Sequence, residues 1–333
     1  MNFRVFKILF SISITATTNG NGLGPANGFT IFTFDSYQAN NTDCTGRVAV
    51  GGSGIYNNFG VGSDLINSYG SRDDLIIGGS LDWNNGQIFN GNIQSSGSTS
   101  LTNVGIPNGN ISSNVNIDFT SAKEVLIEIS DSLFDQEANG TTSNAWGEVS
   151  MVGTNPEFNI FVLTSNELSP LWGMSIDVPQ GSTVLVNIEK NAIQLNNFQT
   201  VLIGCEPSNV LFNFHETAFV QMNSIGWKGT ILAPKATIQF NNGQIDGALI
   251  CTSIQGNGES HHAPFNGMLP GDSNSAVNCD CCCHGDIDWK TGFYVVGEDE
   301  DHDYEEHDTG HPDEDEGCDC SCICLNKSMA LYD

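Results

Sequence analysis

Basic residues are scarce in this chain of 333 residues, which has 10 Lys and Arg against 39 Asp and Glu and a formal net charge of −29. This charge repels phosphates, and no basic stripe along the sequence offsets it. The same argument disfavours an anionic membrane surface. We therefore expect no nucleic acid among the partners of this protein.

Long apolar runs and catalytic motifs are missing too. No segment approaches the roughly 20 apolar residues of a membrane-spanning helix, so no transmembrane helix is expected. The sequence has no G-x-S-x-G and no H-E-x-x-H motif, and Gly51-Gly52-Ser53-Gly54 lacks the Lys-Ser/Thr pair of a P-loop. We predict that the protein is not an enzyme and has no catalytic residues. Scattered Asp and Glu leave a polysaccharide-active β-helix enzyme with a carboxylate pair as an alternative.

Turn-forming residues dominate instead, with 37 Gly and many Asn, Ser and Thr, which favours an all-β domain. Between Gly226 and Gly267, short apolar or alternating runs are separated by Asn-Gly and Asp-Gly turns. Asn242-Gly243 and Asp246-Gly247 supply residues that tolerate positive φ at corners. Strands of four or five residues that alternate with corners are typical of a β-solenoid.

An internal repeat supports the solenoid. The segment from Asn84 to Ile93 (NNGQIFNGNI) matches the segment from Asn241 to Leu249 (NNGQIDGAL) with one residue dropped. The distance between them along the chain is much longer than the roughly 20 to 30 residues of one coil. We therefore expect the two copies to lie in different coils.

A helix is predicted over 121–138, between the capping box Ser121-Ala122-Lys123-Glu124 and the stop at Ala138-Asn139-Gly140. Its apolar stripe must lie on a sheet, because no helical neighbour is expected to cover it. The stripe consists of Ala122, Val125, Leu126, Ile129 and Leu133. Strands are predicted at 29–34, 47–52, 75–77, 87–89, 158–163, 174–178, 183–188, 200–203, 210–214, 230–232, 237–240 and 248–251.

Five segments are expected along the chain. Residues 1–16 resemble a secretory signal peptide, with a first β-strand as the alternative. A flexible lead-in over 17–28 precedes the solenoid domain at 29–269, and a polar linker over 270–278 follows it. The tail at 279–333 carries 17 Asp and Glu against 2 Lys, a net charge of −15.

Four sequence blocks occur in a characteristic order: Gly46–Gly52 (GRVAVGG), Asn209–Phe214 (NVLFNF), Trp227–Ala236 (WKGTILAPKA) and Gly258–Gly267. Over about residues 27–267 they resemble the choice-of-anchor A domain, a family of ice-binding-like adhesive modules of surface proteins. The resemblance implies a right-handed β-helix with a long α-helix packed alongside. The anchor expected after such a domain is missing, because Leu269-Pro270-Gly271 is not a sortase motif and a cysteine-rich acidic segment follows.

One candidate ligand site lies inside the last of these blocks. Glu259, His261 and His262 place a carboxylate and two imidazoles together, as a metal or general-base site requires. A turn beside the last coil is the simpler alternative. We expect no cofactor in the solenoid body.

The tail holds a second set of candidate ligands, in which thiolates and an imidazole suit Zn²⁺ and the neighbouring carboxylates suit Ca²⁺. In an exported protein the same thiols form disulfides, within the tail or between molecules. An inert, disordered acidic tail is the third alternative. The candidates are Cys279, Cys281, Cys282, Cys283, His284, Cys318, Cys320, Cys322 and Cys324.

The three remaining cysteines, Cys44, Cys205 and Cys251, are expected to be buried free thiols. Cys205 and Cys251 are 46 residues apart, which suggests two coils, and stacked positions two coils apart are too distant for a disulfide. Asn-x-Ser/Thr triplets become glycosylation sites if a eukaryotic secretory pathway makes the protein. They begin at Asn40, Asn110, Asn139 and Asn326.

The fold class predicted from these observations is all-β, a right-handed β-helix with one long α-helix and a disordered C-terminal tail. The predicted function is that of a secreted or cell-surface, non-enzymatic adhesive protein that binds extracellular matrix, polysaccharide or a cell-surface ligand. Binding of ice or another crystal surface is the alternative, and regular Thr-x-Thr ladders would favour it. The positions of Thr230, Thr237 and Thr252 share no fixed period.

Overall fold

The computed structural model of the protein describes residues 22–168 and 171–270, which belong to one compact unit, Met1–Asp272. The predicted signal segment, residues 17–21 of the lead-in, nearly all of the linker, and the tail with its candidate ligands lie outside these residues. So does Asn326.

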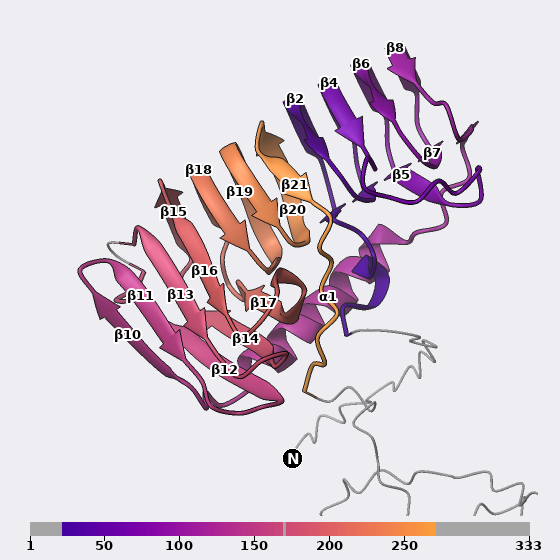
Figure 1. The fold of residues 1–333 in the computed structure, drawn as a ribbon. Helices are drawn as coiled ribbons and strands as arrows, with labels where there is room; N and C mark the ends of the chain where they lie inside the picture. The colour runs from indigo at the N-terminus through magenta and orange to yellow at the C-terminus, as the bar shows by residue number, and fades with distance from the viewer. Residues whose placement is uncertain (1–21, 169–170, 271–333) are drawn as a thin grey trace, which may run out of the picture. The chain divides into compact units, whose positions relative to one another are not determined.

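The strands form one 21-stranded sheet that winds into stacked coils with three faces, which confirms the all-β fold (Figure 1). The strand pairs are parallel, apart from the hairpin of β10 with β11. In the described part of the chain α1 (Phe119–Phe134) is the only α-helix. The hand of the coil stays a prediction.

One face of the coil, the helix face, lies under α1. Where α1 covers this face, the strands are buried on both sides, because one side meets the interior of the coil and the other meets the helix. This is why the covered strands have continuous apolar sequences. The strands of the helix face are β1 (Ile31–Thr33), β3 (Val48–Val50), β5 (Asp73–Ile77), β7 (Asn92–Ser95), β9 (Ile111–Ser112), β12 (Phe158–Leu163), β14 (Thr183–Ile188), β17 (Val210–Asn213) and the first residues of β19 (Thr230–Asp246) and β20 (Leu249–Gly256). Of these, β7 is largely polar in sequence and β9 is exposed.

The other two faces are formed mainly by long strands that continue around a corner. These strands are β2 (Tyr37–Cys44), β4 (Gly54–Val61), β6 (Leu81–Ile88), β8 (Thr99–Gly105), β18 (Phe219–Lys228) and the remainder of β19 and β20. Their first halves, with β15 (Ala192–Asn196), make the glutamine face, and their second halves make the glycine face. The glycine face also contains β10 (Thr141–Ala145), β11 (Glu148–Val152), β13 (Gly173–Asp177), β16 (Gln199–Ile203) and β21 (Glu259–His261).

Asparagines turn the corner between the glutamine and glycine faces. Asn58, Asn85 and Asn242 all have φ near +50°, the left-handed conformation that Asn tolerates better than most residues. The two copies of the sequence repeat lie at this corner, one on β6 and the other on β19, which confirms that they belong to different coils. The runs predicted at 230–232 and 237–240 are parts of one strand, β19, that continues through the corners.

The chain does not stack its coils in sequence order. It begins in the middle of the stack, and the strands β1 to β9 extend from there towards one end. The helix α1 then carries the chain back to the opposite end, from which the strands β10 to β21 return to the middle. The last coil therefore pairs with the first, so that orange β20 and β21 lie beside indigo β2 in Figure 1.

This contact between β1–β2 and β20–β21 is the seam of the solenoid. Its backbone ladder pairs Ile31 with Leu249 and Tyr37 with Ile254. Side chains add to it, since Thr42 Oγ1 donates to the carbonyl of Gly258 at 2.8 Å. The seam thus joins two halves of the coil that are distant in sequence by the same parallel pairing found within each half.

The helix crosses the seam along the stack (Figure 1). Near its start, the Phe119 ring lies 5.4 Å from that of Phe32 on β1. Near its end, Asn187 on β14 donates to the carbonyl of Leu133 at 2.8 Å. Its 16 residues make a rod of about 24 Å, about five strand spacings of 4.8 Å.

The start of the helix differs from the prediction. Its N-cap is Asp118, whose carboxylate accepts hydrogen bonds from the backbone N–H groups of Thr120 and Ser121. Ser121, predicted as the cap, lies inside the first turn, and its hydroxyl donates to Asp118. The predicted capping box was wrong, because the carboxylate of Asp118, three residues earlier, accepts hydrogen bonds from free backbone N–H groups of the first turn. The helix also ends at Phe134, before the predicted stop at 138.

Residues of the predicted lead-in pack on the helix as well. Gly24–Ala26 form the short 3-10 helix η1, and Leu23 and Ala26 are buried with Leu126 in the cluster between α1 and the helix face. The second 3-10 helix, η2 (Pro207–Asn209), leads into β17.

Truncation of Phe32 tests the importance of the seam. Phe32 is fully buried and its ring contacts those of Phe29, Phe34 and Phe119. We expect Phe32→Ala to lower the free energy of unfolding by about 3–5 kcal/mol, because it leaves a cavity between the seam and the helix. Ile55→Ala, at a side chain that is 48% exposed, is the control and should change it by less than about 0.5 kcal/mol. Equal effects in urea denaturation would contradict this account.

Candidate functional site

A row of five glutamines follows the middle of the glutamine face. Cα pairing places each opposite the next on the neighbouring strand, across β15, β18, β19, β20 and β2. The row therefore continues through the seam without a shift of register. In spatial order it consists of Gln194, Gln221, Gln239, Gln255 and Gln38.

Two further polar rows flank these glutamines. Towards the glycine face, asparagine amides bond from coil to coil, with Asn223 donating to Asn196 at 2.9 Å and Asn241 donating to Asn223 at 3.3 Å. On the opposite side, hydroxyl groups pair, with Ser53 and Ser80 at 3.0 Å. Strand ladders fix the backbone below all three rows, so the face offers amides at a repeat of about 4.8 Å.

The sequence contains a signal for this face that the motif analysis missed. Each of the five glutamines begins a Gln-x-Asn tripeptide, whose middle residue is a buried apolar side chain in four cases and Gly256 in the fifth. The tripeptides recur at unequal intervals and are interrupted by the helix, so they show no simple period. They are QAN at 38–40, QLN at 194–196, QMN at 221–223, QFN at 239–241 and QGN at 255–257.

The glycine face contains a hollow of about 660 Å³. It opens where β16 and β18 separate, because their ladder consists of the single pair Gln199 with Gly226. Gly226 projects no side chain there, so a gap remains between the residues of β16 and those of β19. Lys228 and Asp246 lie on the far side of this hollow.

The predicted residues Glu259 and His261 lie beside the hollow on β21. His261 Nδ1 is 2.7 Å from Asp246 Oδ1, and its Nε2 is 3.7 Å from a Glu259 oxygen. Both imidazole nitrogens therefore face carboxylates. Burial, followed by the charge of Glu259, raises the pKa of the neighbouring Asp43.

His262, the third predicted residue, belongs to the seam. Its Nδ1 lies 2.9 Å from Thr30 Oγ1, and its backbone N–H donates to Thr45 Oγ1 at 2.8 Å. The structure thus brings Glu259 together with His261 and places His262 elsewhere. Burial lowers the pKa of His262.

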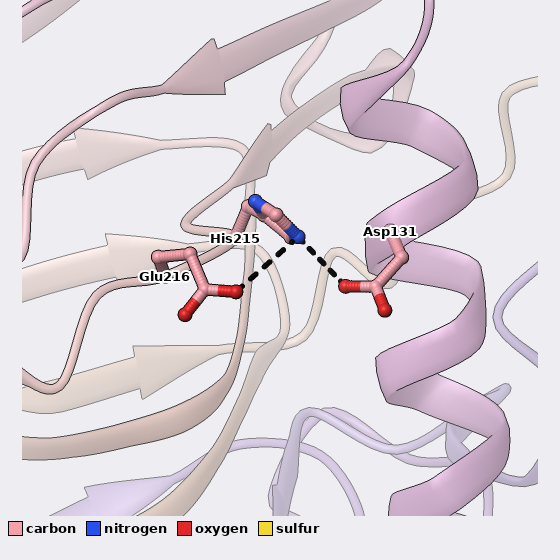
Figure 2. A group of neighbouring side chains, drawn as sticks. All are labelled: Asp131, His215 and Glu216. Carbon is pink, nitrogen blue, oxygen red and sulfur yellow. Dashed lines mark hydrogen bonds and ion pairs between the residues drawn. The ribbon is translucent and has the colours of Figure 1, made fainter.

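A different group of side chains, Asp131, His215 and Glu216, has the geometry of metal ligands (Figure 2). Ligand atoms of Asp131 on α1, His215 and Glu216 lie within 4.8 Å of one another. His215 Nε2 is 2.7 Å from Asp131 Oδ1, and its ring stacks on Phe134 at 4.3 Å.

A cation already lies at this group. The Lys235 ammonium is 2.7 Å from Glu216 and 3.7 Å from Asp131. Its hydrogen bond to Glu216 raises the pKa of Lys235. We interpret the group as an ion network that holds α1 against the loop after β17, since the ammonium supplies the charge that a metal ion would bring.

Cys44, Cys205 and Cys251 are free and buried, as predicted. Burial raises the pKa of all three thiols, that of Cys205 to about 11, so they stay protonated at neutral pH.

Three of the predicted glycosylation sites, Asn40, Asn110 and Asn139, are exposed. The Asn139 side chain is engaged, because it donates to the carbonyl of Phe158 at 2.9 Å and accepts from the N–H of Ile160 at 2.7 Å. Modification at any of them stays a prediction.

The geometry defines a class of protein, a parallel β-solenoid whose polar faces are regular and whose third face is covered by a helix. Residues 22–262 match the family described as "Putative Ice-binding-like adhesive domain". The match covers more than two thirds of the sequence, and the chain belongs to this family. The resemblance inferred from the four sequence blocks is thereby confirmed.

Solved structures give further likenesses. An ice-binding protein from an Antarctic biological consortium is 13% identical, with 79% of this chain and 96% of that chain covered and a TM-score of 0.41. An ice-binding protein from an Arctic yeast is 10% identical, with 75% and 96% covered and a TM-score of 0.36. A search of curated proteins finds no match. No helix among the described residues is both long and apolar enough to span a membrane.

The buried imidazole at the seam predicts acid sensitivity. Because the folded-state pKa of His262 lies below its unfolded value of about 6.5, its contribution to stability is complete above that pH and is lost as the pH falls towards the folded pKa. His262→Gln, which cannot titrate, should flatten the fall in the free energy of unfolding between about pH 7 and pH 5. Parallel stability curves for the two proteins would contradict the assignment.

The ion network predicts that its lysine excludes metal ions. In a protein of residues 20–272, Lys235→Met should raise the affinity for Zn²⁺ about three- to tenfold, because it removes two exposed ion pairs worth about 0.2–1 kcal/mol each. Titration calorimetry measures the change. The gain should disappear when His215→Ala is added, and an unchanged affinity in Lys235→Met would show that the ammonium does not compete.

Proposed function

We propose that this protein is an extracellular, non-enzymatic adhesin whose glutamine face binds a polysaccharide. The observation that carries the proposal is the row of five registered glutamines, which continues through the seam. A primary amide offers two donors and an acceptor. A row of amides therefore matches a polymer that presents hydroxyl groups at a regular repeat.

The rigidity of the face supports the proposal. The glutamines and asparagines stand on a backbone held by strand ladders on both sides, so little backbone entropy is lost on binding. Individual contacts to an exposed amide are weak, and an extended polymer gains affinity by making many of them at once.

Ice binding is a second candidate, favoured by the family description. From β15 to β2 the middle outward row of the glutamine face consists of amides, and Thr237 is the one threonine in the row that also contains Ser253, Ser53 and Ser80. Long amide side chains have several rotatable bonds, whereas a threonine ladder is stiff. The amides therefore favour an organic polymer over an ice lattice.

Lack of catalysis is part of the proposal. Glycoside hydrolysis in most families needs two carboxyl groups that flank the substrate. The hollow of the glycine face contains one carboxylate, Asp246. The family description likewise names an adhesive role and no reaction.

The proposal also includes export through a signal peptide at residues 1–16. It further includes cross-linking or metal binding through the cysteine-rich tail. In this proposal, disulfides of that tail attach the protein to the cell surface. A right-handed coil, which the resemblance implies, belongs to the same proposal.

A binding panel tests the proposed function. We expect the full chain to be retained on at least one immobilised polysaccharide, and the triple variant Gln221→Ala, Gln239→Ala, Gln255→Ala to lose at least tenfold in apparent affinity, or about 1.4 kcal/mol. Ice partitioning is measured in parallel.

The matched control is Ser150→Ala, Ser175→Ala, Gln87→Ala, which trims three outward side chains of the glycine face and should leave retention unchanged. Retention on ice and on no polysaccharide would favour the second candidate. Equal retention of both triple variants would place the adhesive surface elsewhere.

A further inference from the structure

We propose that the hollow between β16 and β18 is a binding subsite for a neutral saccharide unit. This inference deepens the proposed function, on which its choice of ligand rests, but it concerns a different face of the coil. The volume of the hollow, about 660 Å³, falls within the range of about 300–1,000 Å³ typical of small-molecule sites.

The first argument is an unsatisfied hydroxyl. Thr200 lines the hollow and is 3% exposed, and its Oγ1 has no hydrogen-bond partner among the described residues. A buried polar group without a partner costs free energy, so most such groups in proteins are satisfied by protein, water or ligand. A sugar hydroxyl that reaches Thr200 would satisfy it.

The second argument is the open edge of the two strands. After the pair Gln199 with Gly226, the described residues of β16 and β18 form no further ladder pair with each other. β18 pairs on its other side with β19, and β16 pairs on its other side with β13. The backbone edges that face each other across the hollow are therefore available to a ligand.

The third argument is the mixture of groups around the hollow. Val201, which is 50% exposed, gives it an apolar wall, and the amides of Asn197 and Gln199 lie beside that wall. A pyranose ring has an apolar face and a rim of hydroxyls, so it needs this combination. Amide groups can donate to and accept from such hydroxyls.

Charge selects a neutral ligand. Lys228 and Asp246 are Cα partners on neighbouring strands, and their opposite charges cancel at the rim. Gln244 and His261 both bond to Asp246 Oδ1, and no hydrogen bond within the described chain involves Oδ2. Lys228 makes no ion pair with a described residue. Both charged groups can therefore bind hydroxyls, whereas the net charge of −29 repels an acidic polymer.

Gly226 allows the hollow to be filled without strain. A Cβ added there would meet its nearest neighbour, Gln199 Cγ, at 3.7 Å, an ordinary contact. Gly105 lies in the same outward row on β8, and a Cβ there would first meet Gln87 at 3.4 Å. The substitution Gly226→Gln thus blocks the hollow, and Gly105→Gln is its matched control on a distant strand.

The test is a titration of the full chain with four neutral probes, cello-, xylo-, malto- and N-acetylchito-hexaose, and with an acidic oligogalacturonate, all at millimolar concentration and followed by backbone amide NMR. We expect at least one neutral probe to shift signals of residues 197–203 and 224–228. Gly226→Gln should weaken that binding at least tenfold and Gly105→Gln should not. Thr200→Val, which keeps the shape and removes the hydroxyl, should weaken it severalfold.

Binding of no neutral probe, shifts confined to other residues, or undiminished binding by Gly226→Gln would each overturn the proposal. Preference for an oligogalacturonate probe would overturn its neutral-ligand part. The glutamine-face triple variant separates the two proposals, because it should lose retention on the immobilised polymer and keep the hexaose shifts in the hollow.

Discussion

The parallel pairing of the first coil with the last is the interaction on which the rest of the structure depends. The strands before α1 and the strands after it each end in an inner edge whose backbone N–H and C=O groups are free to pair with another strand. Here each half covers the other, through pairs such as Ile31 with Leu249. The helix spans the junction from Phe119 to Leu133 and holds both halves. The glutamine row depends on the same junction, since Gln255 and Gln38 meet across it.

Much of the fold could be predicted from local sequence. The helix-face strands that α1 covers are apolar on both sides, so runs such as 158–163 and 183–188 were recognised with their observed bounds. Corners were recognised because Asn-Gly is among the few pairs that adopt positive φ readily. The N-cap was wrong because Asp118 and Ser121 both satisfy the cap preference, and only geometry decides between them. The stacking order was not predictable, since pairing across the seam leaves no local pattern in either segment.

The candidate site was harder to predict than the fold. Glu259 and His261 were predicted as a candidate site from their chemical groups, and the structure shows the His261 ring between Asp246 and Glu259. The Gln-x-Asn tripeptides carry no reactive chemistry, and their alignment becomes visible only when the coils are stacked. The hollow depends on a missing side chain at Gly226 and on an interrupted ladder. An absence of this kind has no sequence motif.

The position at which the chain enters and leaves the coil has a consequence for how such domains can vary in length. Because both segments of the seam lie in mid-stack, a coil added at either end would lengthen the polar faces without moving the seam. The return segment between β9 and β10 would have to grow by one strand spacing, about 4.8 Å, which is about three residues of helix. The length of the polar faces is thus independent of the position at which the chain enters and leaves the coil. A few helical residues per added coil are enough to lengthen these faces while that position stays the same.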